Sequence, residues 1–154
     1  MRVRRALVED AGGIARVSVR GWQSAYRGLV PNAYLDALDI EERRERWRER
    51  LDDGVCAFVV EQHGIVGYCR VDPPSELASL YVLPERRRGG IGSALLAAGL
   101  DELRARGAEA ATLWVFTVNH AARSFYARFG FVPDGAEGVD GGTGVDEIRL
   151  RAEL

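Results

Sequence analysis

A glycine-rich turn between an apolar strand and an apolar helix restricts the fold of this chain more than any other feature. The turn reads Arg87-Arg88-Gly89-Gly90-Ile91-Gly92; the strand-like run 77–83 precedes it and the helical run 93–100 follows it. A turn at a helix N-terminus presents unpaired backbone N–H groups and the positive end of the helix dipole. Glycines let that backbone approach a ligand closely, and arginines add charged donors. The sequence therefore predicts an anion site, and pyrophosphate is the anion that suits it best.

Length and charge narrow the class of protein. A chain of 154 residues with 47% hydrophobic and 29% charged residues is typical of one globular domain, here residues 1–154. The net charge of −2 argues against nucleic acid or an anionic membrane surface as partner. No stretch approaches the roughly 20 apolar residues of a membrane span, and the first residues do not resemble a signal peptide. We therefore expect a cytoplasmic protein.

The two cysteines and two histidines indicate no metal or disulfide chemistry. Cys56 and Cys69 lie in apolar strand-like runs without CxxC spacing, so we expect buried free thiols. His63 and His120 are too few and too far apart in the sequence for a metal site. No metal is expected.

Hydrophobic periodicity and turn residues predict alternating strands and helices. Strands are expected at 3–7, 55–61, 65–71, 77–83, 110–116, 131–133 and 145–150, and helices at 11–25, 32–38, 40–51, 93–106 and 119–129. Residues 134–144 hold five glycines and indicate a flexible loop. Helices between the later strands require crossovers, so we expect a mixed sheet with helices on both faces.

Two segments together resemble the GNAT (GCN5-related) N-acetyltransferases. Residues 84–96 (PERRRGGIGSALL) are similar to the family motif (Q/R)-x-x-G-x-(G/A), and residues 119–131 (NHAARSFYARFGF) to N-x-x-A-x-x-F-Y-x-x-x-G-F. Residues 22–36 also resemble a bacterial subgroup of the family. The resemblance covers nearly the whole chain. It implies an α/β (α+β) GNAT fold: one mixed, mostly antiparallel sheet of six to seven strands with helices on both faces.

The resemblance also implies a co-substrate, acetyl-CoA. In the family a bulge separates the strand before the glycine turn from its neighbour and opens a slot for the thioester. The residues that would bind acetyl-CoA are Tyr81, Val82, Leu83, Arg87, Arg88, Gly89, Gly90, Ile91, Gly92, Ser93, Ala94, Asn119 and Tyr126.

The implied chemistry is direct attack of a primary amine on the thioester, which needs no nucleophilic cysteine when both substrates are held together. Tyr126 matches the family's general acid for the leaving thiolate. Glu76 matches one of the family's general-base positions, and Trp114 occupies the other. Trp22 and Tyr26 are candidates for the wall of the acceptor site.

Each candidate also has a plain structural interpretation. Glu76 beside a Pro-Pro turn equally fits a solvated carboxylate, and Trp22 and Tyr26 equally fit a buried helix face. Asn119 is also a good helix N-cap, and the two roles are compatible. Tyr126 neighbours Phe125, but helical geometry turns it away from the apolar face. Glu147 and Arg149 are typical surface charges of a half-exposed strand.

The sequence therefore predicts an N-acetyltransferase that moves acetyl from acetyl-CoA to a primary amine in a ternary complex. The alternative is a non-catalytic acyl-CoA sensor on the same fold. A P-loop nucleotide binder is disfavoured because the chain has no lysine. The acceptor, a small molecule or a peptide amine, is not identified, and the resemblance leaves a homodimer open.

Overall fold

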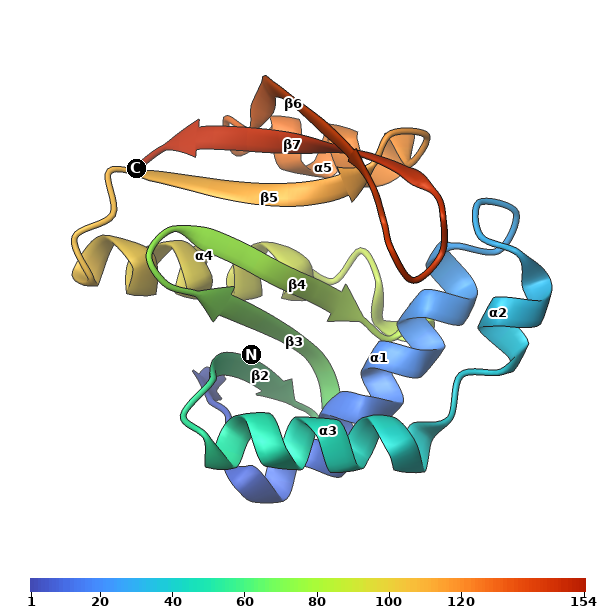
Figure 1. Ribbon diagram of the computed structural model, residues 1–154. Coiled ribbons are helices and arrows are strands. Elements are labelled where there is room, and N and C mark those ends of the chain that lie inside the picture. Colours follow the sequence, from blue (N-terminus) through green and yellow to red (C-terminus); the bar gives the residue numbers. More distant parts are fainter.

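A seven-stranded sheet forms the centre of the computed structural model, which describes residues 1–154 (Figure 1). The strand order is β1-β2-β3-β4-β5-β7-β6. All neighbouring pairs are antiparallel except β4 and β5, which are parallel. The strands are β1 (Val3–Arg5), β2 (Cys56–Glu61), β3 (Ile65–Asp72), β4 (Glu76–Val82), β5 (Ala110–Phe116), β6 (Val132–Val139) and β7 (Asp146–Glu153). This confirms the expected mixed, mostly antiparallel sheet.

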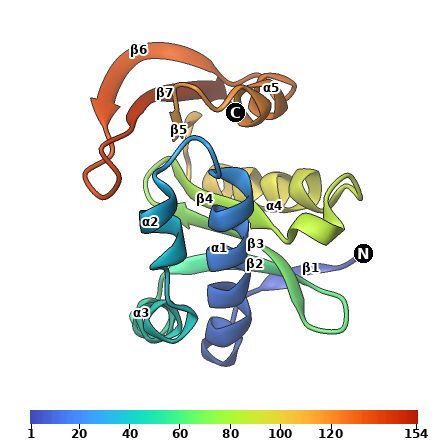
Figure 2. The same cartoon turned by 90° about the vertical axis from the view of Figure 1, so that its right-hand side faces the viewer.

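Helices cover both faces of the sheet, as predicted. Figure 2 shows α4 and α5 on one side of the sheet and α2 and α3 on the other, where α1 packs against α3. None of the helices is both long and apolar enough to cross a membrane. The helices are α1 (Ala11–Ala25), α2 (Asn32–Asp36), α3 (Ile40–Asp52), α4 (Ile91–Ala105) and α5 (His120–Ala127), with short 3₁₀ turns η1 (Val8–Asp10) and η2 (Pro84–Arg86).

The strands β4 and β5 pair only where β4 begins. Their single registered contact joins Glu76 to Thr112, and beyond it the two strands diverge (Figure 1). On its other side, β4 shifts register against β3, so that Ala78 becomes an extra residue between Leu77 and Ser79. A bulge bends a strand and increases its local twist, which accounts for the divergence.

Close packing of α4 fixes the glycine turn relative to the sheet. A Cβ at Gly67 of β3 would lie 3.0 Å from the side chains of Ile91 and Leu95. A Cβ at Gly99 of α4 would lie 3.0 Å from the Cys69 sulfur. Real side chains do not tolerate such distances without a shift, so these glycines allow α4 to approach β3 closely. Cys56 and Cys69 are buried free thiols, as expected.

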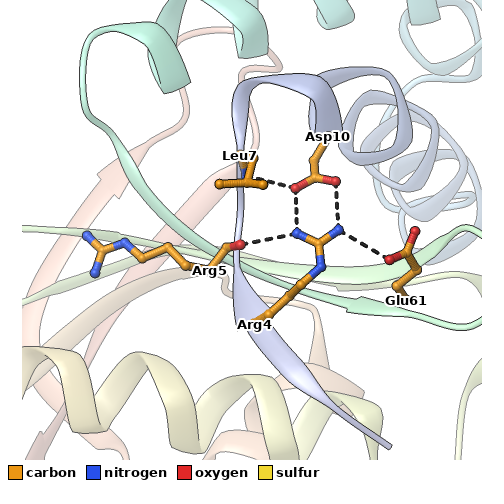
Figure 3. Close-up of polar contacts among 5 residues, drawn as sticks. All are labelled: Arg4, Arg5, Leu7, Asp10 and Glu61. Atoms are coloured by element: carbon orange, nitrogen blue, oxygen red, sulfur yellow. Dashed lines mark hydrogen bonds and ion pairs between the residues drawn. The ribbon is translucent and has the colours of Figure 1, made fainter.

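An ion pair joins β1 to the start of α1 (Figure 3). The guanidinium of Arg4 donates to both carboxylate oxygens of Asp10, at 2.8 and 2.9 Å, and to Glu61 at 3.3 Å. The Asp10 carboxylate also accepts the Leu7 N–H at 2.7 Å. Asp10 is only 7% exposed. The buried Asp10 carboxylate thus holds the turn before α1, and the Arg4 guanidinium compensates its negative charge.

The glycine-rich segment 134–144 differs from its expected structure. Much of it belongs to β6, which pairs with β7 through Glu137 opposite Ile148 and Gly138 opposite Glu147. The register shifts between Pro133 and Glu137. Because β6 is an edge strand, it accommodates glycine and proline that an inner strand would exclude, and pairing with β7 overrides their low strand propensity. The flexible-loop expectation was therefore wrong for residues 134–139.

Candidate active site

A cavity of about 960 Å³ fills the space between the diverging strands β4 and β5. It extends from the glycine turn before α4, past α5, to the end of α1 and the β6–β7 hairpin. Its volume lies at the upper end of the usual range for ligand sites. Most of the sequence-predicted residues on these elements therefore face one continuous space.

The glycine turn exposes a row of backbone donors at one end of this cavity. Arg88 and Gly90 have left-handed backbone angles, with φ of 65° and 80°. Ala94 is the first residue of α4 whose N–H finds a backbone acceptor, the Gly90 carbonyl at 3.0 Å. The N–H groups of residues 88–93 have no backbone partner. Alternating backbone angles and free N–H groups at a helix N-terminus form a concave anion site. We call residues 87–93 the anion cradle.

Most of the predicted acetyl-CoA residues line the cavity. The lining members are Tyr81, Val82, Arg87, Arg88, Gly90, Ile91, Gly92, Ser93, Asn119 and Tyr126. Three do not line it: Leu83, Gly89 and Ala94. Leu83 is buried, and its N–H donates to the Val66 carbonyl at 2.8 Å, so it anchors the end of β4 in the core.

Two predicted residues of α5 border the same space. The Asn119 side-chain oxygen accepts the Ala122 N–H at 3.2 Å and so caps α5, while Asn119 also lines the cavity. Tyr126 packs edge-to-face against Phe125 and Phe131. It is therefore not turned away from the apolar side, as helical geometry suggested. Burial, with smaller effects from Cys69 and Tyr26, raises the pKa of Tyr126, so its hydroxyl stays protonated.

Aromatic rings form the opposite wall of the cavity. The Trp22 and Tyr26 rings meet edge-to-face with centroids 4.8 Å apart, and Tyr26 packs against Phe116 at 4.9 Å. The hydroxyls of Tyr26 and Tyr81 form a hydrogen bond of 2.8 Å. Trp22 and Tyr26 thus line the cavity and also pack against neighbouring side chains, so both interpretations of these residues hold.

Comparison with known proteins identifies the family of this chain. Residues 20–131 match the model of the acetyltransferase (GNAT) family. The chain belongs to the GNAT acetyltransferases. It is 34% identical over 125 residues to the uncharacterized N-acetyltransferase YuaI of Bacillus subtilis, covering 76% of this chain and 72% of that protein. It is also 41% identical over 105 residues to a mycothiol acetyltransferase of Acidimicrobium ferrooxidans, but spans only 34% of that protein.

Solved structures confirm the GNAT fold of this acetyltransferase. A GCN5-related N-acetyltransferase from Rhodopseudomonas palustris superposes with a TM-score of 0.84 over 99% of this chain and 95% of that one, at 22% identity. The structure of yncA from Salmonella typhimurium with its cofactor acetyl-CoA has a TM-score of 0.73 over 100% of this chain and 94% of that one, at 23% identity. The GNAT fold expected from the sequence is thereby confirmed.

Two carboxylates near the split between β4 and β5 differ in whether they line the cavity. Glu76 lies where β4 and β5 are still paired, and it does not line the cavity. Glu147, interpreted as a surface charge, lines the cavity beside the aromatic wall. Glu147 reaches the cavity because it lies on β7 directly opposite Phe116 of β5. Local sequence does not reveal this strand register, so no signal in the sequence pointed to Glu147.

Trp114 of this GNAT protein also lines the cavity. The residue is 39% exposed, and the guanidinium of Arg149 lies 5.9 Å from the ring centroid. Arg149 in turn donates to Asp134 of β6 at 2.6 Å. The side chain at this position therefore supplies an apolar surface, with no carboxylate of its own for proton transfer.

Proposed function

We propose that this GNAT acetyltransferase transfers an acetyl group from acetyl-CoA to a primary amine by direct attack in a ternary complex. One observation carries the proposal: a single cavity joins the anion cradle before α4 to the aromatic wall of α1 through the split between β4 and β5. Two substrates entering from opposite ends would meet in that split. Holding two reactants in contact removes much of the entropic barrier of a bimolecular step.

The residues at the cradle end suit the pyrophosphate and pantetheine of acetyl-CoA. The free N–H groups of residues 88–93 and the side chains of Arg87 and Arg88 offer donors to phosphate oxygens. Beyond Glu76, the β5-facing edge of β4 has no strand partner, so its backbone is free to pair with an extended amide chain. These features support acetyl-CoA as the ligand, because its pyrophosphate carries phosphate oxygens and its pantetheine carries amides.

Proton transfer is assigned to groups at the split. The amine nitrogen forms a bond to the thioester carbonyl carbon and loses a proton, the carbon–sulfur bond breaks, and the leaving thiolate takes a proton. Tyr126 lines the cavity with its hydroxyl protonated, so we assign it the role of this proton donor. The backbone N–H near Val82 is assigned to the oxyanion that develops on the carbonyl oxygen. Trp22 and Tyr26 would contact the acceptor.

Calorimetry and thiol release test the two halves of the proposal. Titration with acetyl-CoA should show binding at concentrations below about 1 mM. Thiol release should then depend on an added amine, with the amine-free reaction as the control. Absence of binding would contradict the assigned cradle. Binding without release for any member of a broad amine panel would contradict transfer and favour an acyl-CoA sensor on this fold.

A further inference from the structure

The charged residues that line the cavity are divided by sign between its two ends. Arg86, Arg87 and Arg88 of the turn, with Arg128 after α5, lie at the cradle end. Asp140 and Glu147, from the β6–β7 hairpin, lie at the other end, where the aromatic wall is. No arginine lines that second end. An acceptor that enters there meets the negative charge of these two carboxylates, which attracts cations.

Strand pairing fixes which way Glu147 faces. Glu147 of β7 is opposite Phe116 of β5, and Trp114 lies two residues earlier on the same strand, so these three side chains share one face of the sheet. That face is the one covered by α1, since the Phe116 ring packs against Tyr26. A Cβ at Gly138 would lie 3.9 Å from a Glu147 carboxylate oxygen and 3.7 Å from the Trp114 ring. The carboxylate therefore lies beside the indole, on the acceptor side of the split.

No cation of the protein neutralises Glu147. It takes part in no ion pair, and the nearby Arg149 is bound to Asp134 and lies over the Trp114 ring. The groups whose charges act on Glu147 are Asp140 at the end of β6 and Glu76 of β4. Burial, followed by these two carboxylates, raises the pKa of Glu147. A carboxylate in this state is a better proton acceptor than an exposed one and gains most from a bound cation.

We infer that Glu147 binds the ammonium group of a cationic acceptor and receives its proton, and that acceptors bearing a carboxylate are excluded. The inference rests on the proposed function. The proton balance is complete: the ammonium loses one proton to Glu147 and becomes a nucleophilic amine. After the nitrogen–carbon bond forms, the nitrogen loses a second proton as the thiolate gains one. Glu147 then releases its proton to solvent.

Three amines of equal chain length test the charge preference. The probes are 1,5-diaminopentane, pentylamine and 5-aminopentanoate, each assayed by acetyl-CoA-dependent thiol release. We expect kcat/KM to fall in that order, with the amino acid at least about 10-fold below the diamine, as for loss of one charged contact. Equal values for the three probes, or a preference for 5-aminopentanoate, would overturn the inference while leaving acetyl transfer intact.

Three variants test the residue itself. Glu147→Gln should lower kcat/KM for 1,5-diaminopentane by about 10²-fold or more, because a positioned base contributes at least that much. It should also remove the increase of kcat/KM with pH that accompanies deprotonation of Glu147. Glu137→Gln is the matched control, since Glu137 is an exposed carboxylate of the same hairpin that does not line the cavity. Glu76→Gln tests the other carboxylate. A larger loss in Glu76→Gln than in Glu147→Gln would assign the base to Glu76 and refute the inference.

Binding without turnover separates the two proposals. Calorimetry of 1,5-diaminopentane with the CoA-bound protein should show binding in the parent protein and in Glu137→Gln, and about 10-fold weaker binding in Glu147→Gln. If this pattern holds while no amine is acetylated, recognition by Glu147 stands and the transfer proposal fails. If the diamine binds the parent and Glu147→Gln equally, recognition by Glu147 fails whatever the activity.

Discussion

The side-chain hydroxyls of Tyr26 and Tyr81 lie 2.8 Å apart and join the end of α1 to β4 at the edge of the cavity. Burial raises the pKa of Tyr26 to about 12 and that of Tyr81 well above its usual value, so both groups remain protonated. This hydrogen bond links the aromatic wall to β4, the strand that diverges from β5. It therefore sets the width of the cavity where we expect the two substrates to meet.

Removing both of these hydroxyls should destabilise the protein by less than the sum of the two single removals. Tyr26→Phe leaves the Tyr81 hydroxyl without its partner, and we expect the free energy of unfolding to fall by about 1–3 kcal/mol. Tyr81→Phe should have a similar effect, while the double variant should lose less than the sum. Urea unfolding of the four proteins measures this coupling, with Tyr34→Phe as a control for the loss of a hydroxyl elsewhere in the same aromatic cluster. Additive losses would show that the bond contributes nothing.

The assigned proton donor Tyr126 should affect turnover and leave binding nearly unchanged. No hydrogen bond within the protein acts on its hydroxyl, and the residue lines the cavity, so Tyr126→Phe should keep its stability and its affinity for acetyl-CoA. We expect kcat to fall by about 10²-fold, the usual contribution of a positioned acid. Steady-state kinetics and calorimetry measure the two quantities separately. An unchanged kcat would remove Tyr126 from the mechanism.

The raised pKa of Tyr126 gives this assignment a pH signature. A general acid is active while it is protonated, and a tyrosine with the ordinary pKa loses its hydroxyl proton near pH 10. Because burial raises the pKa of Tyr126, kcat should show no decline from this group up to about pH 10. A decline below that pH that disappears in Tyr126→Phe would show that the hydroxyl ionises normally.

The left-handed backbone at Gly90 should be needed for acetyl-CoA binding. Gly90→Ala introduces a side chain at φ of 80°, which costs about 1–2 kcal/mol of backbone strain. Gly107→Ala is a matched control, because Gly107 follows the other end of α4 at φ of 90° and does not line the cavity. Both variants should lose similar stability, but only Gly90→Ala should bind acetyl-CoA more weakly by calorimetry. Equal affinities in the two variants would show that the turn shape is unimportant for the ligand.

The elements at the cradle end of the cavity were predictable because their signals are local. A turn that contains Gly90 and Gly92, a strand before it and a helix after it are adjacent in the sequence, and the structure places them as expected. Asn119 and Tyr126 follow from one short motif on one helix. Packing between these segments is then fixed by glycines at contact points, such as Gly67 and Gly99.

The acceptor half was not predictable to the same degree because it depends on long-range pairing. Glu147 reaches the cavity only because β7 pairs with β5 in a register that sets it opposite Phe116. A second long-range pairing, of β6 with the other edge of β7, makes the glycine-rich residues 134–139 part of a strand. Local composition indicated a loop there and a surface charge at Glu147, since neither register nor sheet order is encoded in a single segment.

The ion pair between Arg4 and Asp10 should make the protein sensitive to acid (Figure 3). Hydrogen bonds from Arg4, and then from the Leu7 N–H, lower the pKa of Asp10 in the folded protein against the opposing effect of burial. A lowered folded-state pKa contributes stability that is complete above the unfolded value of about 3.9 and is lost as the pH falls through the folded value.

Asp10→Asn should therefore lower the free energy of unfolding by about 1–3 kcal/mol at pH 7, the cost of losing charged hydrogen bonds to a buried acceptor. The difference from the parent should shrink as the pH falls below about 4, because the parent then loses the same charge. Urea unfolding at a series of pH values measures both effects. Glu61→Gln is the control, since Glu61 contacts the same guanidinium at 3.3 Å but is 54% exposed, and we expect a change below about 1 kcal/mol. A constant difference between Asp10→Asn and the parent at every pH would show that the charge of Asp10 does not stabilise the fold.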